Sequence, residues 1–188
     1  MENYRTFIGI PVRVGDEFLR AREELMKSLE EERISWVASN RYHVTLRFIG
    51  DTGLPAVRAI KKALREQVEV PHRSHVKLGH PGIFGPRKKP RVIWIGFENT
   101  GIFDTLKTAV DRLTEDCGIH PVEQPFRAHL TLGRIRSLKD NHNLTRSIEA
   151  LKEAFSYEVL LESLVFYRSE MGDGGPVYTH LEKLDFRD

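Results

Sequence analysis

Cysteine is almost absent from this chain, since Cys117 is the only one among 188 residues. A lone cysteine excludes an intrachain disulfide and a zinc site built from several thiolates, and it favours a cytoplasmic location. No apolar run approaches the roughly 18 residues that a membrane span needs. The first residues also lack a basic segment followed by an apolar leader core. We therefore expect neither secretion nor membrane insertion.

A strong excess of one charge is also missing. The 29 basic residues nearly balance the 27 acidic ones, giving a net charge of +2 and a sequence pI of about 8.7. This balance permits an anionic substrate but not a bulk nucleic-acid coat, so any basic binding surface must be local. With 40% apolar and 30% charged residues and no linker or low-complexity tract, residues 1–188 are expected to form one domain of two lobes.

A histidine-threonine triplet occurs twice, each time inside an apolar run. The two copies are His43-Val44-Thr45-Leu46 and His129-Leu130-Thr131-Leu132. With 8 histidines and 10 threonines, roughly 0.4 such triplets are expected by chance. Side chains alternate between the two faces of a strand, so each copy would present an imidazole beside a hydroxyl while its apolar residues enter a core. The plain alternative is two half-buried strands, each with a satisfied histidine.

Periodicity predicts interleaved helices and strands, and hence an α+β fold. Asp16 is the expected N-cap of the first helix and Gly118 the expected C-cap of the third. The two triplets are separated by about half the chain, and each precedes a turn and a helix, which favours a pseudo-two-fold arrangement with a site between the lobes. Helices are expected over 16–32, 54–68, 102–117 and from the polar stretch 137–143 to about 155; strands are expected over 6–12, 34–37, 42–49, 76–78, 91–97, 128–135, 158–168 and 177–184.

The residues around the triplets resemble those of a known family. The sequence is similar to the two-histidine (2H) phosphoesterases, and most of all to the RNA 2′,3′-cyclic phosphodiesterases first described as 2′-5′ RNA ligases. The departures are Arg47 in place of the usual Lys, Gly133 in place of Ala, and Tyr42 before the first histidine. The segments that carry the resemblance are Phe7-Ile8-Gly9-Ile10, Trp36-Val37, 43–50, 90–96, 125–134 and Gly175-Pro176-Val177-Tyr178 with Leu181.

The resemblance implies a two-lobed, pseudo-two-fold 2H phosphoesterase fold, with antiparallel sheets lining a central cleft and helices outside. It implies hydrolysis of RNA 2′,3′-cyclic phosphate ends to 2′-phosphates without a metal or cofactor. Some family members also join tRNA halves through a 2′-5′ linkage by the reverse chemistry. The expected partner is therefore RNA with a cyclic phosphate end, tRNA halves included, and the expected state is a cytoplasmic monomer.

The same chemistry follows from the residue types. Opening a cyclic phosphodiester needs a base for water, an acid for the departing ribose oxygen, and donors for the charge on the phosphoryl oxygens. Two imidazoles with ordinary pKa values near 6.5 supply the acid and the base, and Thr45 and Thr131 supply hydroxyl donors unless they are only strand formers. The residues alone do not order the histidines; the family pattern makes His43 the general acid and His129 the general base.

Several basic and aromatic residues are candidates for binding the substrate. Arg134 matches the basic residue of the family's second motif, but strand alternation places it opposite His129 unless a bulge intervenes near Gly133. Arg47 and Arg127 share a face with the histidines on strict alternation and are the fallback phosphate ligands. Phe48 and Phe84 could stack on a base, and the segment 87–91 could follow an RNA backbone. The alternatives are surface ion pairs, core aromatics and a solvated loop.

Two other functions stay open at this point. A nucleotide or RNA binding module could use the same groove without turnover, and a hydrolase could act on another cyclic or linear phosphodiester. A zinc site from His72, His75 and His80 is not expected, because their spacing matches no familiar ligand set and carboxylates beside them are few.

Overall fold

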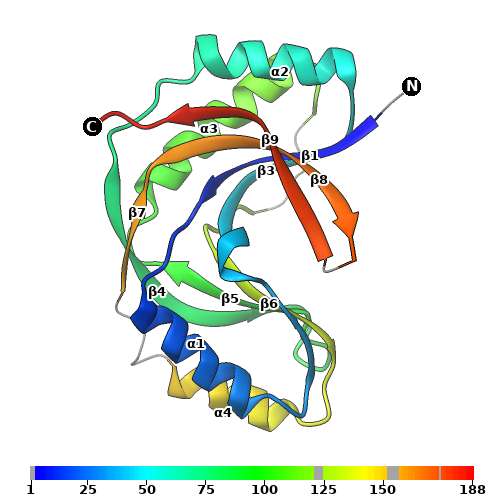
Figure 1. The fold of residues 1–188 in the computed structure, drawn as a ribbon, viewed down its shortest axis with the longest axis vertical. Helices are drawn as coiled ribbons and strands as arrows, with labels where there is room; N and C mark the ends of the chain where they lie inside the picture. Colours follow the sequence, from blue (N-terminus) through cyan, green and yellow to red (C-terminus); the bar gives the residue numbers. More distant parts are fainter. Residues whose placement is uncertain (1–2, 121–124, 152–156, 174) are drawn as a thin grey trace.

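Two antiparallel sheets dominate the computed structural model, which describes residues 3–120, 125–151, 157–173 and 175–188 (Figure 1). The strands are β1 (Asn3–Pro11), β2 (Arg33–Trp36), β3 (His43–Gly53), β4 (Ser74–Phe84), β5 (Val92–Phe97), β6 (Leu130–Ser137), β7 (Glu158–Leu161), β8 (Ser163–Gly172) and β9 (Gly175–Asp185). The helices are α1 (Asp16–Ser28), α2 (Leu54–Gln67), α3 (Gly101–Asp116) and α4 (Asn141–Ala150), with a 3₁₀ turn, η1, at Ser39–Arg41.

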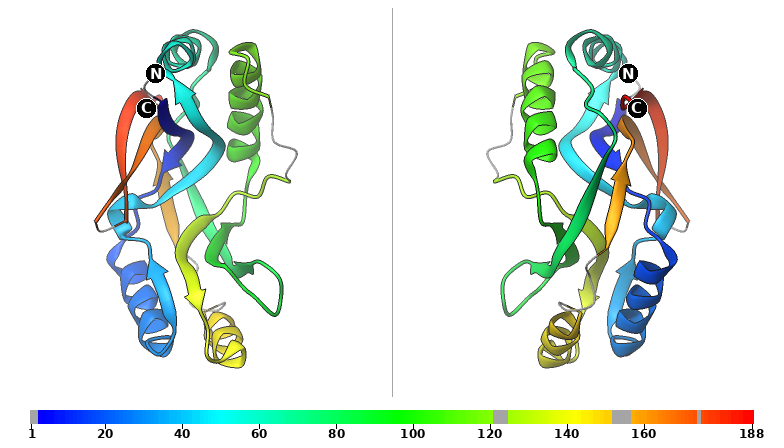
Figure 2. Two further views of the ribbon diagram at one scale, coloured as in Figure 1. Left: turned by 90° about the vertical axis from the view of Figure 1, so that its right-hand side faces the viewer. Right: turned by 90° about the vertical axis from the view of Figure 1, so that its left-hand side faces the viewer.

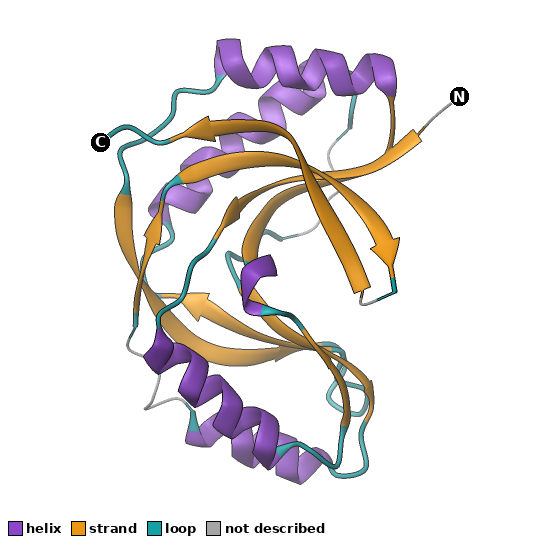
Figure 3. Cartoon of the chain, viewed as in Figure 1, coloured by secondary structure: helices purple, strands orange, loops and turns teal. Residues whose placement is uncertain are grey.

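Each sheet forms one lobe with helices on its outer side. The first sheet has the strand order β3-β1-β8-β9, and the second has the order β2-β6-β5-β4-β7. Helices α2 and α3 pack against β3, whereas α1 and α4 pack together beside the second sheet (Figures 1 and 3). The inner faces of the two sheets are therefore turned toward each other, and the predicted α+β architecture of two antiparallel sheets with external helices is confirmed.

The chain passes repeatedly from one lobe to the other. Strand β1 lies in the first sheet and β2 in the second, and α3 leaves the second sheet to cover the first before the chain returns as β6 (Figure 2). One continuous core joins both lobes, because Ile8 and Val44 of the first sheet and Ile93 and Leu130 of the second belong to the same cluster of buried apolar residues. The cleft-facing side chains are thus held by one shared core.

Several local expectations differ from the structure, and the first helix, expected to extend to residue 32, ends at Ser28. Asp16 is the first residue of α1, and the cap is Gly15, which has no side chain to accept a hydrogen bond. The expected strand over 158–168 is broken at Glu162 into β7 and β8, which belong to different sheets. Strand β4 continues to Phe84, so it includes part of the expected loop. The predicted end of the fourth helix near residue 155 lies outside the described residues.

Close approach explains one glycine that carries the family resemblance. A Cβ at Gly9 in β1 would lie 2.6 Å from the backbone oxygen of Val44 in β3. Only glycine lets the two backbones meet beside the first triplet. Elsewhere, none of the helices formed by the described residues is long and apolar enough to cross a membrane.

Candidate active site

Both histidine-threonine triplets line one cleft between the two sheets. His43 and Thr45 lie in β3, Thr131 lies in β6, and His129 comes directly before β6. The cleft has a volume of about 430 Å³, and all four side chains contribute to its wall. The apolar residues between and after them are buried in the core, with Val44 and Leu130 fully inaccessible. The alternation predicted from the sequence is therefore observed in both strands.

Each imidazole is oriented by the backbone two residues earlier. His43 Nδ1 donates a hydrogen bond to the backbone oxygen of Arg41, and His129 Nδ1 donates one to the backbone oxygen of Arg127, both at 2.8 Å. A carbonyl oxygen only accepts, so Nδ1 carries a proton in both rings. The nitrogen left for chemistry in the cleft is therefore Nε2 in both cases.

Aromatic rings pack against each imidazole. The His43 ring lies 4.9 Å from the Phe7 ring and meets Tyr178 edge-on at 5.2 Å, measured between ring centroids. The His129 ring meets Phe84 edge-on at 4.8 Å. Rings held on their faces and edges cannot rotate freely, so both imidazoles are preorganised for a bound anion.

Burial lowers the pKa of both histidines below the ordinary value of 6.5. The hydrogen bonds to the carbonyl oxygens of Arg41 and Arg127 oppose this, because they favour the charged rings. The Arg134 guanidinium lowers both pKa values further, and the charge of His129 lowers the pKa of His43. The positive charges therefore disfavour simultaneous protonation of the two rings, which suits a pair made of one acid and one base.

A β-bulge brings Arg134 into the cleft. Trp94 of β5 pairs with Thr131 of β6 and Ile93 pairs with Gly133, so Leu132 is an extra residue in β6. The extra residue changes the alternation, and Arg134 reaches the wall that holds Thr131. The bulge expected near Gly133 is present one residue earlier, and Arg134 lines the cleft that contains the two histidines.

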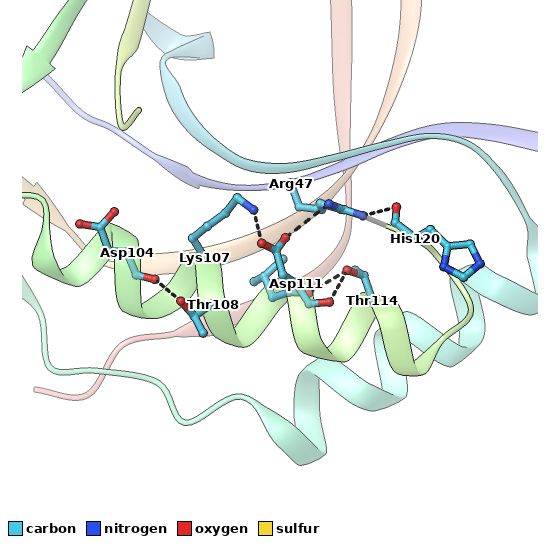
Figure 4. Close-up of polar contacts among 8 residues, drawn as sticks. Arg47, Asp104, Lys107, Thr108, Asp111, Thr114 and His120 are labelled. Atoms are coloured by element: carbon cyan, nitrogen blue, oxygen red, sulfur yellow. Dashed lines mark hydrogen bonds and ion pairs between the residues drawn. The ribbon is translucent and has the colours of Figure 1, made fainter. Parts of the chain in front are cut away.

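Arg47 does not face the cleft, contrary to the alternation argument. Leu46 is an extra residue in β3 opposite Ile8 and Gly9 of β1, and this bulge turns Arg47 to the other face of the strand. Its side chain is only 5% exposed and meets Asp111 of α3 at 3.5 Å, while its Nη2 donates to the backbone oxygen of His120 at 2.6 Å (Figure 4). Lys107 also pairs with Asp111, so Arg47 ties β3 to α3 and is not placed to hold a phosphate.

The remaining candidates lie around the cleft in different ways. Phe84 contacts His129 and stacks on Trp94, with ring centroids 4.7 Å apart. Arg127 is exposed beside His129, with its guanidinium 5.2 Å from the centre of the Trp94 ring. Phe48 is not among the residues that line the cleft; it is 49% exposed, and the guanidinium of Arg5 lies over its ring, 5.1 Å from the ring centroid.

Sequence reasoning did not name as site residues several that line the cleft, among them Arg41, Arg136 and Tyr178. Arg41 precedes the first histidine by two positions, as Arg127 precedes the second, so an Arg-x-His-x-Thr pattern occurs twice and could have identified it. Arg41 Nη1 donates to the backbone oxygen of Pro176 at 2.9 Å, which fixes the β9 end of the wall. Tyr178 lies outside that pattern, but the closing segment 175–178, which carries the family resemblance, could have identified it. Burial raises the pKa of its hydroxyl, which therefore stays protonated and can donate at neutral pH.

Comparisons with known proteins agree on one family. The sequence model of the family described as "LigT like Phosphoesterase" matches residues 8–94 and 98–178. The RNA 2′,3′-cyclic phosphodiesterase of Aquifex aeolicus is 32% identical over 153 residues, which cover 79% of each chain. The protein of the same name from Methanothermobacter thermautotrophicus is 26% identical over 95% of this chain and 96% of its own length.

Solved structures have the same fold over nearly the whole length. A protein of Thermus thermophilus superposes with a TM-score of 0.73 and 25% identity, covering 97% of this chain and 98% of its own. Escherichia coli LigT complexed with 3′-AMP superposes with a TM-score of 0.72 at 18% identity over both complete chains.

Proposed function

Since the chain belongs to the LigT-like phosphoesterase family of the 2H superfamily, we propose that it hydrolyses RNA 2′,3′-cyclic phosphodiester ends to 2′-phosphates. The observation that carries the proposal is the pair of imidazoles in one cleft, each with Nδ1 held by a carbonyl and Nε2 left for proton transfer. The relatives that bear the name RNA 2′,3′-cyclic phosphodiesterase support the substrate class.

Two proton transfers accompany one substitution at phosphorus. His129 Nε2 takes a proton from water as the water oxygen bonds to phosphorus, and His43 Nε2 gives a proton to the ribose 3′ oxygen as the bond from phosphorus to that oxygen breaks. The product keeps its phosphate on the 2′ oxygen. The Arg127 guanidinium favours the neutral form of His129, as a general base requires.

Charge that develops on the non-bridging oxygens needs donors in the cleft. The hydroxyls of Thr45 and Thr131 and the guanidinium of Arg134 supply them, and a guanidinium binds two oxygens at once. Hydrogen bonds to a charged acceptor contribute roughly 1.5 to 3 kcal/mol each. Removal of Arg134 should therefore lower kcat/KM by about 10- to 100-fold.

Ligation is the near variant of the same reaction. When a 5′ hydroxyl of a second RNA end replaces water, the same two proton transfers give a 2′-5′ linkage, and tRNA halves are the RNA ends expected there. The described side chains of the site all come from one chain, which supports an enzyme that acts as a monomer, and its proposed location is the cytoplasm.

The test is hydrolysis of an oligonucleotide with a 2′,3′-cyclic phosphate end in excess EDTA. We expect a 2′-phosphate product, and a fall in kcat/KM of about 10² to 10⁴ for His43→Ala and for His129→Ala. His75→Ala is the control, because His75 is exposed on β4 and remote from the cleft lining. Turnover that survives both replacements would refute the mechanism, and tight RNA binding without turnover would indicate a binding module instead.

A further inference from the structure

A strongly basic groove continues from the cleft along the second lobe. It has a volume of about 650 Å³ and lies between the loop that joins β4 to β5, the strand β6 and the start of α4. Arg134 and Arg136 line both the groove and the cleft, so the two hollows are contiguous. Figure 2 shows the β4–β5 loop projecting from this lobe beside α4.

The groove carries positive charge without compensation. Its basic side chains are Lys88, Lys89, Arg91, Arg134 and Arg136, all exposed, and no acidic residue is among those that line it. None of the five forms an ion pair with a residue that the structure describes. Cations concentrated in a concave surface of a nearly neutral chain are typical of sites that bind a polyanion.

The other groove that leaves the cleft has a different character. It begins at His43 and Tyr178 and follows β8 and β9, and it contains acidic as well as basic side chains. Arg13 lies 3.8 Å from Glu162, and Lys183 lies 2.6 Å from an oxygen of Asp185. Cations already paired with carboxylates attract phosphates less, so the basic groove is the better path for a nucleic-acid strand.

The loop that carries three of these cations has a defined backbone. Lys89 N donates to Pro86 O, Arg91 N donates to Phe84 O, and Ile135 N in β6 donates to Arg91 O, each at 2.8 Å. Gly85 adopts a φ of +116°, which glycine allows and which closes the turn. The three cations are therefore presented from an ordered backbone beside β6.

We propose that this basic groove binds the backbone phosphates of the RNA strand that leads to the reacting end. The inference rests on the proposed function, because it makes an RNA strand, and not a cyclic mononucleotide, the preferred substrate of the same cleft. RNA is the partner because a 2′,3′-cyclic phosphate requires the ribose 2′ hydroxyl. The terminal phosphate lies at the two histidines and Arg134, and the preceding phosphates lie along Arg136 toward Arg91 and Lys88.

The experiment compares kcat/KM for a cyclic-phosphate mononucleotide and for an RNA of about eight nucleotides with the same end. In Lys88→Gln/Lys89→Gln/Arg91→Gln we expect about a 10-fold loss with the longer RNA and less than a twofold change with the mononucleotide. In the same variant, the slope of log kcat/KM for the longer RNA against log salt concentration should become less negative by about 2, because each lost phosphate contact accounts for about 0.7. Arg58→Gln/Lys62→Gln/Lys77→Gln removes the same charge from exposed sites outside this groove and should leave both substrates unaffected.

The outcomes separate this inference from the proposed function. Equal losses of kcat/KM for the longer RNA in the two triple variants would refute RNA binding by the groove. So would the absence of a preference of the native protein for the longer RNA, and neither result would contradict the proposed hydrolysis. If neither substrate is hydrolysed, the proposed function fails. The affinity for labelled single-stranded RNA, measured by fluorescence anisotropy, then tests RNA binding by the groove on its own. The groove variant must then bind at least about fivefold more weakly than the matched control, and equal binding refutes the proposal.

Discussion

Arg134 influences both imidazoles, because its guanidinium lowers the pKa of His43 and of His129. Replacement by glutamine removes a positive charge that opposes protonation of either ring. We therefore expect the pKa values of both histidines to rise in Arg134→Gln, and both limbs of the pH profile of kcat/KM to move toward alkaline pH. NMR titration of the two imidazole Cε1 protons measures the shifts directly.

Arg136→Gln is the matched control for this titration, since Arg136 also lines the cleft but is not a cause of either pKa shift. If only one histidine responds to the loss of Arg134, the two rings do not share one electrostatic environment. The cleft would then not work as a coupled acid-base pair.

Individual side chains were predictable from the sequence only as far as the strands are regular. Alternation correctly placed His43 and Thr45 opposite Val44, and it failed at Arg47, one residue after the extra residue Leu46. The second strand has its bulge at the corresponding leucine, and there it brought Arg134 into the cleft. Bulges depend on the register with a neighbouring strand, which no local pattern in these leucines indicates.

At the scale of elements, the contact of Arg47 with Asp111 and with the backbone of His120 joins β3 to α3. Arg47→Ala leaves Asp111, which is 25% exposed, with Lys107 as its remaining ionic partner. We expect the free energy of unfolding to fall by about 2 kcal/mol, less than for a fully buried pair. Urea unfolding of Arg47→Ala, Asp111→Ala and the double variant measures both the loss and the coupling.

The double-mutant cycle also has a functional arm. If Arg47 were a phosphate ligand, its replacement would raise KM for RNA without coupling to Asp111. A large KM effect together with additive stability losses would contradict the role of Arg47 as a link between β3 and α3.

Elements were predicted best where one period covers the whole segment. Helix α2 starts at its expected residue, because an apolar period begins there beside Gly53 and Pro55, and β3 starts one residue after its expected first residue. The segment 158–168 has two apolar runs, 159–161 and 164–167, on either side of Glu162 and Ser163, and Glu162 separates two strands that join different sheets. An apolar pattern indicates which residues are buried but not which sheet buries them, so the polar pair marks an interruption and not the change of sheet.

For the whole molecule, the lowered pKa values of the two histidines make stability depend on pH. The unfolded chain takes up these protons near pH 6.5, whereas the folded chain takes them up only at lower pH. Their contribution is fully present above pH 6.5 and is lost as the pH falls through the folded pKa values. We expect His43→Gln to lose less unfolding free energy than the native protein between pH 7.5 and pH 5, as measured by urea unfolding.

His75→Gln provides the comparison, because it removes an exposed imidazole from β4. Its loss of stability over the same pH range should parallel that of the native protein. If His43→Gln loses as much unfolding free energy between pH 7.5 and pH 5 as the native protein, burial of the His43 ring does not cause the loss of stability at acid pH.

The two-lobed arrangement was predictable through the family resemblance and the doubled triplet, and not from composition. The sequence could not show that the chain passes repeatedly between the two lobes or that one core of buried residues joins them. Those contacts lie between residues far apart in the chain. The basic segment 87–91 was visible in the sequence, but its junction with Arg134 and Arg136 depends on the β6 bulge and on the pairing of β5 with β6.

The paired bulges also suggest how a duplicated half can specialise. Each strand gains one extra residue directly after its threonine, and the fifth residue after each histidine is Phe48 in one copy and Arg134 in the other. The two copies therefore keep the histidine and the threonine at equivalent positions while these later positions diverge. The two histidine-threonine copies thus differ in charge at this position, and an asymmetric nucleotide can be oriented by that difference.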